Sequence, residues 1–165
     1  MALEFTNLQR VLGDYINEVR SHYIDKITQE GHNASNNLIN SIRVIMERNS
    51  SSIEVSLSLA DYWKYLESGT KPHWPPQQAI LDWIRVKPVL PTEKDGRVPT
   101  EQQLAYLISR KIAREGTPAT NLLEETLEDV NNRYEELISE AINKDLDEGL
   151  TAILLQYMGN TPGNS

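Results

Sequence analysis

The 165-residue sequence contains no cysteine, which excludes disulfide bonds, thiolate metal sites and a cysteine nucleophile. No stretch approaches the roughly 20 consecutive apolar residues that a membrane-spanning helix needs. Polar residues such as Glu4 and Asn7 interrupt the first residues, so we predict no signal peptide. We therefore expect a soluble protein that is made in the cytoplasm and has no membrane partner.

Residue patterns that support catalysis or cofactor binding are also scarce. The three histidines, His22, His32 and His73, do not cluster, and the chain has no HExxH, EF-hand or glycine-rich phosphate-binding sequence. We predict no cofactor, no metal site and no catalytic residues, and hence a protein that is not an enzyme. One enzymatic alternative is a small hydrolase that uses His73 with Asp82 and with Ser68 or Thr70 as nucleophile. A proline-rich loop around His73 explains these residues without catalysis.

Charge is distributed unevenly along the chain. Residues 121–148 hold ten acidic and two basic residues, which equals the whole net charge of −8. An acidic helix face repels phosphate, so we do not expect a DNA-binding protein that reads sequence. Arg110, Lys111 and Arg114 form a basic cluster, which is either an ordinary helix surface or a partner for the acidic residues, within the chain or across an interface.

Hydrophobic spacing predicts an α+β protein with two long helices, shorter helices and a small antiparallel sheet. The sheet is a hairpin over about residues 42–59, where apolar and polar residues alternate. Long helices are predicted over about residues 6–30 and from about residue 121. Three shorter helices are predicted between them: one that is capped by Asp61, one with Pro76 in its first turn that reaches about residue 84, and one over residues 100–115 that is capped by Thr100. The last helix has heptad spacing that favours packing on the first, and we predict an extension from about residue 143, with a bend near Gly149. Residues 86–99 are predicted to form a loop.

Residues 62–119 contain an ordered series of motifs. A tyrosine-rich segment ends in Glu67-Ser68-Gly69-Thr70 and is followed by Lys71-Pro72-His73-Trp74-Pro75-Pro76, then by a short segment with Trp83. Further on comes Arg110-Lys111-Ile112-Ala113-Arg114-Glu115-Gly116-Thr117-Pro118. In order and spacing this series resembles the tail-completion, or head–tail joining, family of long-tailed bacteriophages. Glycines that end helices and prolines that stiffen connections give these residues structural roles.

The length of the chain predicts a single domain, over residues 1–158, and the polar residues 159–165 are predicted to form a disordered tail. The resemblance implies that the domain is a neck or tail-completion domain. It implies a homo-oligomeric ring in the virion neck, between the portal or adaptor side and the tail tube or terminator side. Genomic DNA would pass through the ring without sequence recognition, and the subunit would reside in the host cytoplasm during assembly. The positions that match the family's motifs are Glu67, Gly69, Thr70, Pro72, His73, Pro75, Pro76, Arg110, Lys111 and Gly116, which either contact a partner or fix the fold. We predict an oligomer or partner interface at Trp63, Tyr65, Glu67, Thr70, Lys71, His73, Trp74, Arg110, Lys111 and Arg114.

The chain also departs from the family's pattern. Leu122-Leu123 stands where relatives often have Phe-Leu, and the loop at 86–99 and the helix beyond about residue 143 are longer. We expect these additions to bind partners peculiar to this virion. The alternative without a virion is an intracellular adaptor that binds another protein through its hairpin and its Tyr and Trp side chains.

Overall fold

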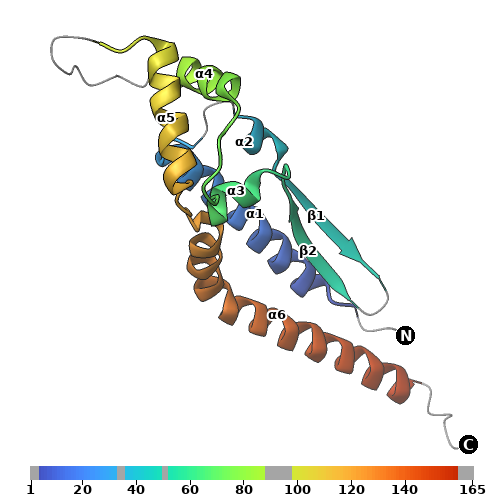
Figure 1. Cartoon of the computed structure of the whole chain (residues 1–165). Coiled ribbons are helices and arrows are strands. Elements are labelled where there is room, and N and C mark those ends of the chain that lie inside the picture. Colours follow the sequence, from blue (N-terminus) through green and yellow to red (C-terminus); the bar gives the residue numbers. More distant parts are fainter. Residues whose placement is uncertain (1–3, 33–35, 50–51, 88–97, 160–165) are drawn as a thin grey trace, which may run out of the picture. The chain divides into compact units, whose positions relative to one another are not determined.

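A computed structural model of the protein describes residues 4–32, 36–49, 52–87 and 98–159. The described chain is mostly helical, with a two-stranded antiparallel sheet, and the prediction of an α+β fold is confirmed (Figure 1). In order, the elements are α1 (Thr6–Gln29), α2 (Asn37–Ser41), β1 (Arg43–Arg48), β2 (Ile53–Ser58), α3 (Trp63–Ser68), α4 (Gln77–Val86), α5 (Glu101–Glu115) and α6 (Leu122–Gly159). Among the described residues, no helix is long and apolar enough to span a bilayer.

The chain divides into two compact units. Unit 1 comprises residues 1–22, 43–58 and 125–165, and unit 2 comprises residues 23–42 and 59–124. Helices α1 and α6 each contribute residues to both units. The expectation of a single domain over residues 1–158 stays a prediction. Most of the expected loop at 86–99 and nearly all of the expected tail at 159–165 lie outside the described residues.

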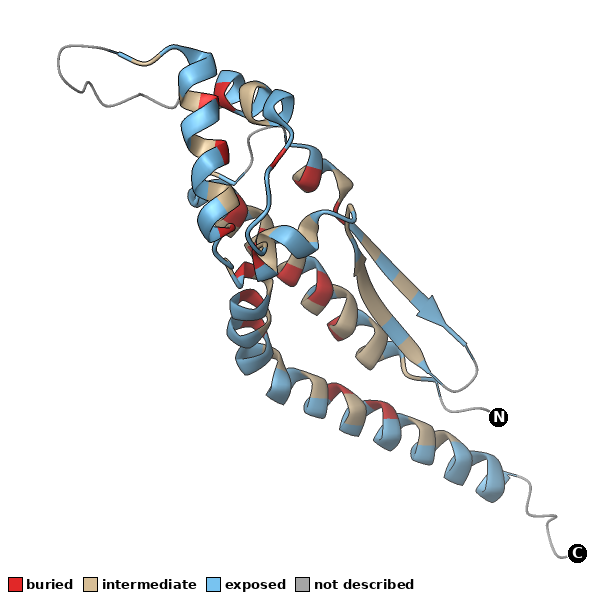
Figure 2. Cartoon of the chain, in the orientation of Figure 1, coloured by how far each residue is buried: buried red, intermediate tan, exposed pale blue. Residues whose placement is uncertain are grey.

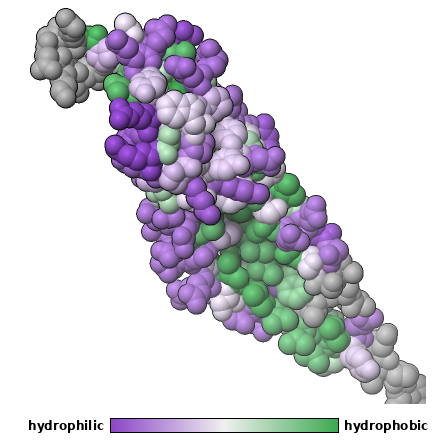
Figure 3. Space-filling view, viewed as in Figure 1, coloured by the Kyte–Doolittle hydropathy of each residue, from purple (hydrophilic) through white to green (hydrophobic). Residues whose placement is uncertain are grey.

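The hairpin of unit 1 has the predicted alternation. Val44 pairs with Leu57, and Met46 pairs with Val55, so these apolar side chains share one face of the sheet. At the turn, Ser52 N–H donates to the side chain of Asn49 and Asn49 N–H donates to the Ser52 carbonyl. None of the strand residues is fully buried, and the visible face of unit 1 is rich in apolar side chains (Figure 3).

Helices α1 and α6 pack against each other within unit 1, as the heptad spacing predicts. The rings of Tyr15 and Tyr134 meet edge to face with 5.6 Å between their centroids, and Tyr15 Oη donates to Asn131 at 2.8 Å. Glu18, one turn after Tyr15 on α1, forms an ion pair with Arg133, which directly precedes Tyr134 on α6. Helix α6 continues through Gly149 to Gly159, so the predicted extension is part of one unbroken helix.

The short elements of unit 2 begin and end close to the predicted positions, with two corrections. The prediction that Asp61 caps α3 is wrong, because Tyr62 occupies the cap position without a side-chain bond and Trp63 N–H donates to the Ala60 carbonyl. Pro76 precedes α4 instead of occupying its first turn. At α5 the predicted cap is confirmed, since Thr100 and Gln103 form a reciprocal capping box.

Buried side chains of α1 follow a helical stripe that differs slightly from the predicted one (Figure 2). Val19, Tyr23 and Ile27 are completely buried, whereas Leu8, Leu12 and Tyr15 of the predicted stripe are only half-buried. Gly31 ends the helix with a φ of 69°, as predicted. Its carbonyl accepts a hydrogen bond from Lys87 Nζ at 2.7 Å, which ties this end of α1 to the end of α4.

Candidate functional site

Two Gly-Thr segments from the motif series lie side by side in unit 2. Thr70 N–H donates to the Thr117 carbonyl and Thr117 N–H donates to the Thr70 carbonyl, each at 3.1 Å. The two hydroxyl groups also hydrogen-bond to each other at 2.9 Å. We call Gly69, Thr70, Gly116 and Thr117 the Gly-Thr junction. It joins the segment that follows α3 to the segment that follows α5 by a single antiparallel β-bridge.

The glycines of the junction allow the two backbones to come this close. Gly69 has a φ of 67° and Gly116 a φ of 74°, a region that side chains other than hydrogen disfavour. A Cβ atom on Gly69 would lie 2.2 Å from the Thr117 carbonyl oxygen, and one on Gly116 would lie 1.9 Å from that of Thr70. Both positions therefore require glycine for two reasons: a side chain would clash with the opposite backbone, and other residues disfavour these φ values.

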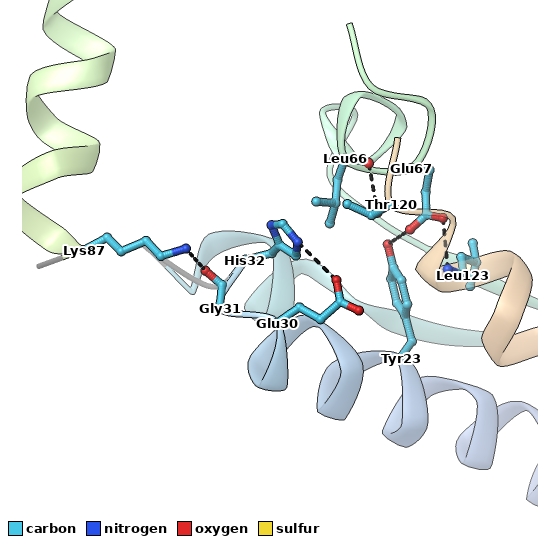
Figure 4. A network of polar contacts seen from close by, with 9 residues as sticks. All are labelled: Tyr23, Glu30, Gly31, His32, Leu66, Glu67, Lys87, Thr120 and Leu123. Atoms are coloured by element: carbon cyan, nitrogen blue, oxygen red, sulfur yellow. Dashed lines mark hydrogen bonds and ion pairs between the residues drawn. The ribbon is translucent and has the colours of Figure 1, made fainter. Parts of the chain in front are cut away.

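Glu67 lies beside the junction and connects three helices (Figure 4). One carboxylate oxygen accepts a hydrogen bond from Tyr23 Oη at 2.8 Å, and the other accepts one from Leu123 N–H at 2.9 Å. The second bond satisfies a backbone donor in the first turn of α6. Burial, followed by the hydrogen bond to Glu67 and its negative charge, raises the pKa of Tyr23 well above its ordinary value. Tyr23 is therefore a hydrogen-bond donor at any physiological pH.

The end of α3 is held by the residues that lead into α6. Thr120 N–H donates to the carbonyls of Leu66 and Glu67, and Thr120 Oγ1 donates to the Leu66 carbonyl at 2.9 Å. Asn121, with a φ of 54°, directs its own N–H to the Glu67 carbonyl. These bonds satisfy the carbonyls that a helix leaves unpaired at its C-terminus, so the motif residues connect the elements of unit 2.

The predicted interface positions between residues 63 and 74 divide into a half-buried group and an exposed group. Glu67 and Thr70 are half-buried and bonded within unit 2 as described, and Trp63 is also half-buried. Tyr65, Lys71, His73 and Trp74 are exposed, and Trp74 packs on Tyr106 of α5 with 5.9 Å between the ring centroids. The exposed group is available to a partner, whereas Glu67 and Thr70 hold the fold.

The predicted basic cluster lies on the surface of α5. Arg110, Lys111 and Arg114 are exposed, and Arg114 forms an ion pair with the adjacent Glu115. The hydrogen bond from Arg114 lowers the pKa of Glu115, although desolvation of the carboxylate acts in the opposite direction. Tyr106 and Leu107, one turn earlier on α5, line an open groove together with Pro99, Gln102 and Gln103.

The groups of the hydrolase alternative have other partners. Ser68 Oγ donates to the Lys64 carbonyl, Thr70 bonds to Thr117, and His73 Nδ1 lies 2.9 Å from the Lys71 carbonyl. Asp82 accepts a hydrogen bond from Gln78 on the same helix. These bonds do not assemble a triad in the part of the chain that the structure describes. Over the same residues, no three His, Asp or Glu side chains are grouped so that they could hold a metal ion.

One charged residue with a structural role was missed by the sequence analysis. Asp145 reads as one of ten acids on a solvated helix, but it is only 2% exposed. Its carboxylate accepts hydrogen bonds from Asn7 N–H at 2.9 Å, Leu8 N–H at 2.8 Å and Asn7 Nδ2 at 2.7 Å. The pairing of Thr70 with Thr117 was also missed, although the repeated Gly-Thr with a preceding acid, at Glu67 and Glu115, was a usable signal.

Comparisons with protein-family models, with curated proteins and with solved structures find no match to this chain.

Proposed function

We propose that the protein is a non-enzymatic structural subunit of a tailed bacteriophage virion, acting in the neck as a tail-completion or head–tail joining ring. In this proposal the ring lies between the portal or adaptor proteins and the tail tube or terminator proteins. Genomic DNA passes through its bore without sequence recognition. The subunit is made in the host cytoplasm and is retained in the mature particle.

The observation that carries the proposal is the order and spacing of the motifs over residues 62–119, which resemble those of the tail-completion family. The Gly-Thr junction supports it, because the two most distinctive motifs, around Gly69 and Gly116, bond to each other. Their glycines are sterically required there. Because the two distant segments need both motifs in order to pair, the motifs support the resemblance more strongly than they would if each only ended a helix.

The surface chemistry also fits a protein that binds other subunits. Tyr65 is 65% exposed and Trp74 56% exposed, and aromatic side chains with a polar group are enriched at protein–protein interfaces. The exposed basic residues of α5 lie on the same unit. An intracellular adaptor that is not part of a virus particle would use the same exposed aromatic residues. The test must therefore determine whether the protein is present in virus particles.

The test is mass spectrometry of gradient-purified particles, together with deletion of the gene. We expect peptides of this chain in mature particles in several copies, and we expect the deletion to yield filled heads and free tails that do not join. Purified particles that lack the chain would favour the adaptor. Turnover of an ester or peptide substrate by the purified protein, abolished by His73→Ala, would favour the hydrolase.

A further inference from the structure

The last turns of α6 present an apolar row that continues from an acidic one. Residues spaced by four and three positions share a helix face, and one such row consists of Glu136, Glu140, Asn143, Asp147, Leu150, Leu154 and Tyr157, all exposed. Leu150 is 56%, Leu154 62% and Tyr157 81% exposed. Residues 149–159 carry no charge. Apolar residues in such a row are typical of a helix that docks against another surface.

Helix α5 presents a row of the complementary kind. Gln103, Leu107, Arg110 and Arg114 follow the same spacing and are all exposed, with Leu107 51% exposed. The first half of this row borders the open groove that Tyr106 and Leu107 help to line. The second half is basic, and the exposed Lys111 lies beside it.

The two rows match when the helices run antiparallel. If Leu107 lies opposite Leu150, then Arg110 lies opposite Asp147, Arg114 lies opposite Asn143, and Gln103, beside the groove, lies opposite Leu154. Both rows change from apolar to charged at the same step, because Leu107 and Arg110 are three residues apart, as are Asp147 and Leu150. Sustained spacing of three and four is that of antiparallel helix packing with a small crossing angle.

We propose that the acidic and apolar row of α6 docks on the basic and apolar row of α5 of a second copy of this chain. The occupant is identified by complementarity, since one alignment brings Leu107 to Leu150 and, one turn away, Arg110 to Asp147. The contact joins different surfaces of the two copies, so repetition of it generates a ring or a filament. It rests on the proposed function, to which it supplies a subunit interface.

Sedimentation velocity of the full-length protein over a dilution series tests this contact. Charge reversal by Arg110→Glu or Asp147→Arg places like charges opposite each other, and we expect each to weaken self-association by roughly tenfold. The controls Lys64→Glu and Glu54→Arg make the same charge changes at exposed positions of α3 and β2. They should leave association within about threefold of the unsubstituted protein.

The apolar half of the contact has a matched pair of variants. Leu154→Glu alters the docking row, whereas Leu155→Glu alters a neighbouring side chain that is equally exposed, at 65%, but points away from the row. We expect Leu154→Glu to weaken association by about tenfold or more and Leu155→Glu to change it much less. All the variants replace exposed residues, and their circular dichroism should match that of the original chain.

Mixing experiments separate contacts between copies from contacts within one chain. A mixture of Arg110→Glu protein with Asp147→Arg protein restores opposite charges only across two molecules, so we expect association to recover in the mixture. A chain that stays monomeric at high concentration would overturn the inference. So would controls that weaken association as much as the row variants, or a mixture that does not recover. A chain that self-associates through these rows but is absent from virions would retain the contact and refute the proposed function.

Discussion

At the scale of single residues, the Gly-Thr junction shows how little freedom the motif positions have. Gly69 and Gly116 each follow the last residue of a helix, and each places its Cα against the carbonyl of the opposite threonine. The threonine hydroxyls, 2.9 Å apart, satisfy each other in a half-buried position. Any side chain at either glycine would have to separate the two segments, and with them the ends of α3 and α5.

Substitution Gly116→Ala should therefore destabilise the protein strongly. The added Cβ would meet the Thr70 carbonyl oxygen at 1.9 Å, and alanine would also occupy a φ of 74°. We expect the free energy of unfolding to fall by about 2–4 kcal/mol, measured by urea denaturation followed by circular dichroism. The control is Gly159→Ala, where a Cβ meets no atom within 4 Å. Equal stability of Gly116→Ala and the original chain would show that the segments separate at no cost.

At the scale of elements, α1 depends on α6 for the end that its own sequence leaves uncapped. Helix α1 has no acidic residue in its first turn, where a negative charge would satisfy the free N–H groups and favour the helix dipole. Asp145 supplies that charge from α6, 138 residues further along the chain. Burial by itself raises the pKa of Asp145, but the N–H groups of Leu8 and Asn7 and the Asn7 side chain lower it below its ordinary value.

This depressed pKa makes the stability contribution of Asp145 dependent on pH. Because the folded-state pKa lies below the unfolded-state value, the carboxylate stabilises the fold at neutral pH, and the contribution is lost as the pH falls below about 4. We expect Asp145→Asn to lower the unfolding free energy by about 1–3 kcal/mol at neutral pH. The difference from the original chain should shrink in acid. The control is Glu135→Gln on the exposed face of α6, and a difference that stays constant with pH would contradict the capping role.

The elements with strong local signals could be predicted from the sequence, and the contacts between distant segments could not. The alternation around Val44 and Val55, the Thr100 cap and the terminating Gly116 each depend on residues within a few positions. Asp145 is indistinguishable by sequence from nine neighbouring acids, because only its contact with Asn7 and Leu8 buries it. Similarly, Glu67 reads as an exposed helix residue until Tyr23 and Leu123 are brought to it.

At the scale of the whole molecule, the side chains of α6 are less buried toward the C-terminal end of the helix. Val130, Ala141 and Asp145 are buried, whereas the large apolar side chains from Leu150 onward are exposed (Figure 2). Such a helix end contributes little to the stability of a single chain, because its apolar side chains remain largely in water. Exposed apolar groups that stay in one row along a helix are instead available for association.

Truncation of the chain after Gly149 should therefore weaken self-association while leaving the folded structure stable. The deletion leaves the capping residue Asp145 and the contact of Tyr15 with Tyr134 in place, so we expect the free energy of unfolding to change by less than about 1 kcal/mol. The same deletion removes Leu150, Leu154 and Tyr157 from the docking row, so self-association should weaken by more than about tenfold. In particles, the truncated chain should fail to join heads to tails although it accumulates as folded protein. Loss of cooperative unfolding in the truncated chain would instead show that the last turns of α6 belong to the core of unit 1, and normal assembly of infectious particles would show that these turns bind no partner.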